Sequence, residues 1–250
     1  MQNNFYLINS FLNIYKKPSQ QSEVTSQIIY GEKFKILRKN KNWIKIKMSF
    51  DNYVGYIKNS KYVKKFNPKY KVSDLKARIF KKPGISANNW LPLGSKLSVI
   101  HENKNYIKIE KNKWIKKKDI KNISHKEKDF VKTFKKFLNV KYKWGGKTYK
   151  GIDCSALIQI FFKYNNLFYP RDTKDQIKYS KKKFQRVKFK KGDIIFWKGH
   201  VAICLNSKKL IHAYGPEKKV VIMPIIETII RIEKTANLKV KKITNINYYK

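Results

Sequence analysis

One cysteine and two histidines in the C-terminal half have the residue types of a nucleophilic site. Cys154 follows Gly151-Ile-Asp153 and opens a segment whose apolar residues recur at helical spacing. The unpaired N–H groups and the dipole at a helix N-terminus favour a thiolate, so we expect the pKa of Cys154 to fall. A thiolate with a base nearby is a nucleophile.

His200 and His212 supply the candidate base and its orienting partner. His200 begins a strand-like run 46 residues after Cys154, and His212 lies in the next such run, 12 residues further on. If these two runs pair as a hairpin, His212 lies beside His200 and can orient its ring. Nucleophile, base and orienting group then form a triad in which cysteine takes the place of serine.

The second cysteine, Cys204, belongs to a different environment. It lies four residues from His200, roughly 13 Å along a strand at about 3.3 Å per residue. We interpret it as a small core residue, and we expect no Cys154–Cys204 disulfide in a reducing compartment. Zinc bound by Cys154, His200 and His212 is an alternative, although the close ligand pair of most zinc sites is missing. We therefore predict neither a metal nor another cofactor.

The elements that must position these residues follow from the spacing of apolar side chains. Helical spacing covers 129–138 and 155–164, and strand-like runs cover 193–197, 200–205 and 210–214. Helices followed by antiparallel strands predict an α+β domain.

The first half of the chain contains a repeat. Both copies alternate apolar and polar residues in short runs that Gly, Pro and Asn interrupt, which predicts short antiparallel strands. A barrel of this size buries little surface, so we expect each one to lean on its neighbours. The two copies are Ile14–Pro18, Gly31–Phe34, Asn42–Lys47 and Gly55–Lys58, then Ile79–Pro83, Gly94–Leu97, Asn105–Glu110 and Lys113–Lys116.

The domain boundaries follow from these patterns. We predict two small all-β barrels over residues 1–66 and 67–122, and the α+β domain over 123–250. The polar stretch 117–128 is interpreted as a linker.

Charge dominates the composition. The 250 residues include 59 basic and 16 acidic side chains, a net charge of +43, with 42% hydrophobic residues. The positive net charge excludes an acidic solvating protein, and the hydrophobic fraction indicates a packed core. The lysines are spread along the whole chain, which favours a solvated basic surface over a nucleic-acid interface. Attraction for an anionic substrate or polymer remains open.

Two sequence features bear on where the protein is located in the cell: the length of its apolar runs and the segment after Met1. No run approaches 18 apolar residues, so no membrane span is predicted. The segment after Met1 lacks a basic region, a long apolar run and a small-residue cleavage site, so no signal peptide is recognisable. We expect a cytoplasmic protein, with an exported form as the alternative.

Six short motifs surround the cysteine and the histidines. They are Tyr142–Gly146, Gly151–Ser155, Pro170–Thr173 with Gln176, Gly192–Phe196, His200-Val201 and Ile211–Ala213. In order and spacing, across residues 130–225, they resemble the NlpC/P60 family of cysteine peptidases. The resemblance implies a papain-like fold with Cys154 as nucleophile, His200 as general base and His212 as orienting residue. It also implies that Tyr142 supports an oxyanion site beside the Cys154 amide.

The two N-terminal repeats resemble bacterial SH3 domains. Together with the family resemblance, this arrangement is similar to the γ-D-glutamyl-L-diamino acid endopeptidases of murein recycling, which require a free N-terminal L-alanine. The resemblance implies a substrate ammonium near Asp153 and Asp172, and a glutamate carboxylate near Ser155 and Thr173. Glu23 and Tyr56 are the candidates that the first repeat contributes to the amine pocket.

The sequence thus predicts a cysteine endopeptidase that cuts the γ-D-glutamyl–diamino acid bond of peptidoglycan-derived peptides. One alternative is an exported hydrolase of intact peptidoglycan, held there by its SH3 domains and its charge. Another is a non-enzymatic wall-binding protein with a relict site. A nucleic-acid partner is not expected, and the preferred diamino acid and the oligomeric state are left open.

Overall fold

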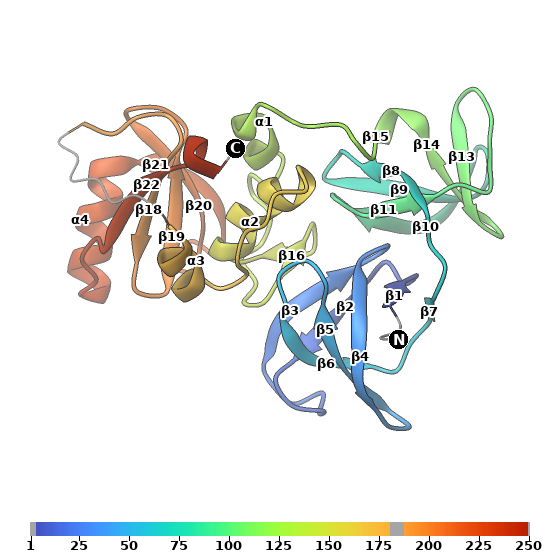
Figure 1. Ribbon diagram of the computed structural model, residues 1–250. Helices are drawn as coiled ribbons and strands as arrows, with labels where there is room; N and C mark the ends of the chain where they lie inside the picture. Colours follow the sequence, from blue (N-terminus) through green and yellow to red (C-terminus); the bar gives the residue numbers. More distant parts are fainter. Residues whose placement is uncertain (1–3, 181–187, 250) are drawn as a thin grey trace. The chain divides into compact units, whose positions relative to one another are not determined.

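The computed structural model describes residues 4–180 and 188–249 (Figure 1). The chain divides into two compact units, an N-terminal unit of residues 1–126 and a C-terminal unit of residues 127–250. No helix among the described residues is both long and apolar enough to cross a membrane.

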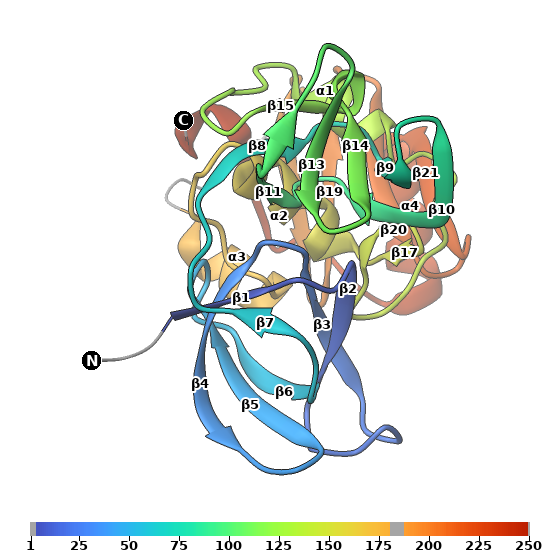
Figure 2. The same ribbon diagram turned by 90° about the vertical axis from the view of Figure 1, so that its right-hand side faces the viewer.

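The first part of the N-terminal unit is a seven-stranded antiparallel sheet with the strand order β3-β2-β6-β5-β4-β1-β7. Figure 2 shows β4, β5 and β6 side by side. Strand β5 explains the lysine-rich sequence, since Ile44, Ile46 and Met48 are buried while the residues between them are not. The strands are β1 Asn4–Leu7, β2 Phe11–Tyr15, β3 Val24–Ile29, β4 Lys33–Lys39, β5 Trp43–Met48, β6 Val54–Lys58 and β7 Tyr62–Val63.

The second part of the N-terminal unit is also all β. It contains a five-stranded sheet, β10-β9-β14-β13-β12, and a three-stranded sheet, β11-β8-β15. The strands are β8 Pro68–Val72, β9 Lys76–Lys82, β10 Ile85–Pro92, β11 Lys96–Ser98, β12 His101–Glu102, β13 Tyr106–Glu110, β14 Lys113–Lys116 and β15 Ile120–Asn122.

The predicted linker 117–128 is wrong over its first half. Residues Lys117–Asp119 form a 3-10 turn, η1, and β15 pairs with β8 so that Ile120 lies opposite Val72. Ile120 is buried in the core of this part. The burial of Ile120 and the backbone pairing with β8 together hold a segment whose other residues are polar.

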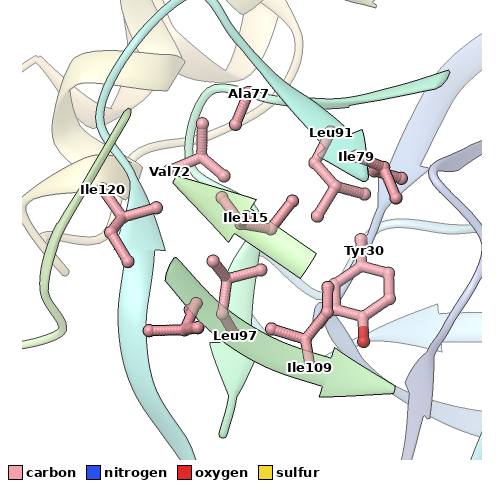
Figure 3. Packing of buried hydrophobic residues seen from close by; sticks show 10 residues of the cluster. Tyr30, Val72, Ala77, Ile79, Leu91, Leu97, Ile109, Ile115 and Ile120 are labelled. Atoms are coloured by element: carbon pink, nitrogen blue, oxygen red, sulfur yellow. The ribbon is translucent and has the colours of Figure 1, made fainter. Parts of the chain in front are cut away.

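The two β parts share a core, as expected for barrels of this size. Tyr30, which follows β3, packs among Ile79, Leu91 and Ile109 of the second part (Figure 3). Its hydroxyl donates to Oε1 of Glu110 at 2.8 Å. Gly31 beside it has a φ of +74°, and a Cβ there would lie 2.2 Å from the Lys96 carbonyl oxygen, so only glycine fits this contact.

The C-terminal unit has a five-stranded antiparallel sheet in the order β21-β20-β19-β18-β22. Helix α2 packs on β19 and β20, and α4 contacts β21; Figure 1 shows the two helices on opposite sides of the sheet. The strands are β18 Asp193–Trp197, β19 His200–Cys204, β20 Lys209–Tyr214, β21 Lys219–Pro224 and β22 Lys242–Asn245, with a short pair β16 Lys147–Thr148 and β17 Gly151–Ile152. The helices are α1 Phe130–Lys135, α2 Cys154–Tyr164, α3 Thr173–Tyr179 and α4 Ile225–Ala236, with a final 3-10 turn, η2, over Ile246–Tyr249.

These elements confirm the predicted α+β class and the three strand-like runs. Strands β21 and β22 and helix α4 were not predicted. Helix α2 also differs from the amphipathic helix that its spacing predicts, because every residue in it except Lys163 is buried. A helix covered on all sides can place a reactive group at its end away from water.

Candidate active site

Cys154 is the first residue of α2, and its side chain meets two other segments. Asp153 caps the helix by accepting a hydrogen bond from the Ala156 N–H at 2.8 Å. The thiol lies 3.9 Å from the Gly199 carbonyl oxygen, to which it donates. The backbone N–H of Val201 and the hydroxyl of Thr173 also donate to the sulfur. The starts of α2, α3 and β19 therefore converge on one sulfur atom.

The predicted lowering of the thiol pKa is wrong in direction. Burial raises the pKa of Cys154 to about 11, and the negative charge of Asp153 acts in the same direction. The two hydrogen bonds to the sulfur and the nearby Arg171 charge lower the pKa, but they offset only part of the rise. The sulfur is almost fully enclosed, so the free-energy cost of burying a thiolate exceeds the stabilisation that the helix N-terminus gives it. The resting group is a thiol.

His200 and His212 are joined as predicted by a β-hairpin. Strands β19 and β20 pair antiparallel, and His200 Nε2 lies 2.9 Å from His212 Nδ1. Burial lowers the pKa of His200 to about 4. Burial, followed by the charges of His200 and Arg231, lowers the pKa of His212 well below its usual value. Both rings are neutral at pH 7, and Nδ1 is the nitrogen of His200 left to take a proton.

Two aromatic residues that the sequence reasoning missed hold the histidine rings. Tyr214 stacks on His212 with ring centroids 4.5 Å apart and an interplanar angle of 12°. Trp197, opposite His200 in the β18–β19 ladder, has its ring 5.5 Å from that of His200. The signal was available for Tyr214, because residues 212 and 214 of a strand point to the same face.

A buried ion pair fixes the loop before Cys154. Both oxygens of Asp153 accept from the Arg171 guanidinium, at 2.6 and 3.0 Å. The same carboxylate accepts from the Gly145 N–H at 2.9 Å and from the Ser155 hydroxyl at 3.1 Å. Arg171 also donates to the Ser155 hydroxyl at 2.9 Å. Asp153 and Ser155, both predicted to contact substrate, are thus engaged inside the protein.

Arg171 lies within the Pro170–Thr173 motif, and the sequence predicted no role for it. It is one of only five arginines among 59 basic residues. A planar guanidinium can bind a carboxylate through two parallel hydrogen bonds, which a lysine cannot do. An isolated arginine in a lysine-rich chain, two residues before a helix, was the usable signal.

Tyr142 and Asp172 lie close to the same site. The Tyr142 N–H donates to the Lys218 carbonyl at 2.7 Å. Burial, followed by the Cys154 charge, raises the pKa of its phenol, so the hydroxyl stays protonated and can donate. Asp172 precedes α3, and its side chain does not cap that helix. Burial raises the pKa of Asp172.

Glu23 and Tyr56 belong to the N-terminal unit. Glu23 pairs with Lys16 at 3.5 Å on the surface. Tyr56 lies opposite Tyr15 in the β2–β6 pairing, and Lys45 Nζ is 5.6 Å from its ring. It lines a cavity of about 270 Å³ together with Pro18, Arg38, Asn40, Trp43 and Lys45. The positive charges of Arg38 and Lys45 at this cavity repel an ammonium group. The contribution of Glu23 and Tyr56 to an amine pocket stays a prediction.

Cysteine and metal chemistry beyond the candidate triad is limited. Within the described part of the chain, neither Cys154 nor Cys204 forms a disulfide bond, and Cys204 is a core residue as predicted. Among residues 4–180 and 188–249, no group of three His, Cys, Asp or Glu side chains could hold a metal ion.

Family models match both units. The NlpC/P60 family model matches residues 139–237, and the model described as bacterial dipeptidyl-peptidase SH3 domain matches residues 14–61. The C-terminal unit is an NlpC/P60 domain. It follows a bacterial SH3 domain, and the predicted SH3 character of residues 67–122 stays a prediction.

Relatives of known structure or name agree with this assignment. Dipeptidyl-peptidase 6 of Lysinibacillus sphaericus is 23% identical over 84% of this chain and 87% of its own length. The gamma-D-glutamyl-L-lysine dipeptidyl-peptidase of Bacillus subtilis strain 168 is 34% identical over 43% of this chain, and the match spans only 39% of that protein. An NlpC/P60 family protein from Bacillus cereus ATCC 10987 superposes with a TM-score of 0.75, at 18% identity, over 89% of this chain and 94% of its own. This last likeness shows the fold, and the NlpC/P60 match supports a peptidase.

Proposed function

We propose that this chain is a cysteine endopeptidase that hydrolyses the γ-D-glutamyl–diamino acid bond of peptidoglycan stem peptides. The observation that carries the proposal is the convergence of the Cys154 sulfur with the start of β19, where His200 is bonded to His212 at 2.9 Å. The name of the Bacillus subtilis relative, a gamma-D-glutamyl-L-lysine dipeptidyl-peptidase, supports the class of bond.

The first step is attack of the sulfur on the scissile carbonyl carbon. Because thiol and imidazole are both neutral at rest, proton transfer from Sγ to Nδ1 of His200 accompanies the attack. The carbonyl oxygen gains negative charge, and the groups proposed to stabilise it are the Cys154 N–H at the start of α2 and the Tyr142 hydroxyl. His212 accepts the Nε2–H of His200 and stabilises the imidazolium that forms.

Three further proton transfers complete the reaction. The His200 imidazolium donates its Nδ1 proton to the leaving amine of the diamino acid, and a thioester remains on Cys154. His200 then takes a proton from water as the water oxygen attacks the thioester carbonyl. Collapse of this second intermediate returns the proton to sulfur and releases the γ-glutamyl carboxylic acid, which then ionises in water.

The residues around the sulfur divide into two groups in this proposal. Asp153 and Ser155 act by holding Arg171 and the loop that presents Cys154, since their polar atoms are engaged with each other. Asp172 and Thr173 are the side chains proposed to meet the substrate. The carboxylate of Asp172 suits the ammonium group of an N-terminal L-alanine. The Thr173 hydroxyl donates to the Cys154 sulfur at rest, and we propose that it turns its hydrogen to the glutamate carboxylate when substrate is bound.

Free murein peptides are the proposed substrates, in a recycling role in the cytoplasm. The second candidate is an exported hydrolase of intact peptidoglycan. Its specific support is the net charge of +43, which attracts the chain to anionic polymers.

One substrate pair tests both candidates. The purified protein is incubated with L-Ala-γ-D-Glu-diaminopimelate and with the same peptide N-acetylated on alanine, and products are followed by mass spectrometry. Cleavage of the free peptide alone supports recycling. Cleavage of both supports the wall hydrolase, and cleavage of neither overturns the proposed function.

A further inference from the structure

His212 has a second close contact, on the side of its ring away from His200. Its Nε2 lies 3.3 Å from the sulfur of Met223. Met223 comes from β21, the strand next to β20, where Val221 is the direct partner of His212. Both ring nitrogens of His212 are thus engaged, Nδ1 with His200 and Nε2 with Met223.

The ring of His212 carries a single proton. It is fully buried, and the charged group that acts on it is Arg231 of α4, which pairs with Glu217 at 2.8 Å. The other titratable neighbours are His200 of β19 and the stacked Tyr214 of β20. A cation nearby and burial both favour the neutral ring, so one nitrogen is an N–H and the other is bare.

The sulfur of Met223 determines which ring nitrogen of His212 carries the proton. A thioether has no hydrogen to donate and can only accept. With the proton on Nδ1, two lone pairs would face each other at 3.3 Å. With the proton on Nε2, His212 donates to sulfur and its bare Nδ1 accepts from Nε2–H of His200.

We infer that Met223 is a positioning residue that selects the tautomer of His212 and thereby leaves Nδ1 of His200 as the basic nitrogen. A thioether does this without adding a charge beside two buried rings. The structural part of this inference stands on the contacts of His212 alone, and its kinetic consequence rests on the proposed function.

The tautomer is read directly by NMR of protein labelled with ¹⁵N in histidine. In the wild type we expect Nε2 of His212 at the shift of a protonated nitrogen and Nδ1 at that of a bare one. Met223→Leu keeps the size of the side chain and removes the acceptor, so both nitrogens should move toward intermediate shifts. His200→Gln and His212→Gln assign the signals. A protonated Nδ1 in the wild type, or unchanged shifts in Met223→Leu, overturns the inference.

Kinetics give the second measurement. Losing one hydrogen bond should lower kcat of Met223→Leu about fivefold with KM unchanged. Met48→Leu is the matched control, because it makes the same change at a methionine that is buried in the first sheet and lies in the other unit, and we expect its kcat to stay at the wild-type value. A fall in kcat together with a rise in KM, or an equal effect of Met48→Leu, would show a merely structural role. If the wild type cleaves neither peptide, the proposed function fails while the NMR result still decides the tautomer.

Discussion

The two units bury polar side chains to very different extents. Among the described residues, five polar or charged side chains are buried in the N-terminal unit and sixteen in the C-terminal unit. A buried polar group destabilises the fold unless a partner satisfies it. In the C-terminal unit such partners are other buried side chains: Arg171 pairs with Asp153, and Asn245 donates to Asp193.

The difference comes from how each sheet is covered. Strand β5 leaves Lys45 and Lys47 partly exposed, and β13 alternates in the same way. Strand β18 is buried at every residue, between β19 and β22 within a unit that also contains α2 and α4. A sheet covered on both faces provides an interior dry enough to shift pKa values, and the candidate site lies there. The described N-terminal unit also holds buried groups with shifted pKa values, Tyr30 and Lys71 among them, but it contributes no residue of the candidate triad. Substitutions there are therefore expected to change the chemistry least.

The largest expected effect is loss of the nucleophile. Cys154→Ala should lower hydrolysis of L-Ala-γ-D-Glu-diaminopimelate by a factor of about 1,000 or more, because no thioester can form. Mass spectrometry measures the product, and circular dichroism checks that the fold is kept. Cys204→Ala is the matched control and should retain activity. Wild-type rates in Cys154→Ala would contradict the mechanism.

The buried ion pair predicts the next effect, on stability. Arg171→Met leaves the Asp153 charge buried without its partner and should destabilise the C-terminal unit by about 3–5 kcal/mol. Arg231→Met removes a partly exposed pair with Glu217 and should cost about 1 kcal/mol or less. Urea unfolding measures both. Equal effects would mean that burial does not distinguish the two arginines.

A pH dependence tests the dry interior. The folded-state pKa of His200 is lowered to about 4 from an ordinary value of 6.5. The unfolded chain therefore binds a proton between these values that the folded chain does not, and stability should fall as pH drops from 6.5 toward 4. The melting temperature of His200→Gln should fall less over this range. Parallel curves for wild type and variant would contradict a buried neutral imidazole.

The smallest effects are expected in the N-terminal unit. Glu23→Gln and Tyr56→Phe should each change kcat/KM for the free peptide by less than about threefold, since one pairs with an exposed lysine and the other lies beside Lys45. Steady-state rates on the free and N-acetylated peptides measure this. A tenfold loss of kcat/KM confined to the free peptide would establish the predicted amine pocket. It would also contradict the expectation that substitutions in the N-terminal unit affect activity least.

Much of the C-terminal unit was predictable because local signals carry it. Asp153 ahead of an apolar helix marks the start of α2, and the two strand-like runs at His200 and His212 predict the hairpin that joins them. Helix α4 was missed although its signal was present, because Ile225, Ile229 and Ile232 recur at helical spacing directly after Pro224. Ile120 was missed because a three-residue edge strand has too few positions to show a period.

The sequence by itself determined the types and order of the reactive residues, the α+β class and the repeat in the first half. Those depend on covalent order and on periodicities of two or 3.6 residues. Only the tertiary structure decided that the Cys154 pKa rises instead of falling, that Arg171 takes up Asp153, and that the sulfur of Met223 faces His212. These properties depend on how completely water is excluded and on which distant side chains meet, and neither is written in the spacing of residues along the chain.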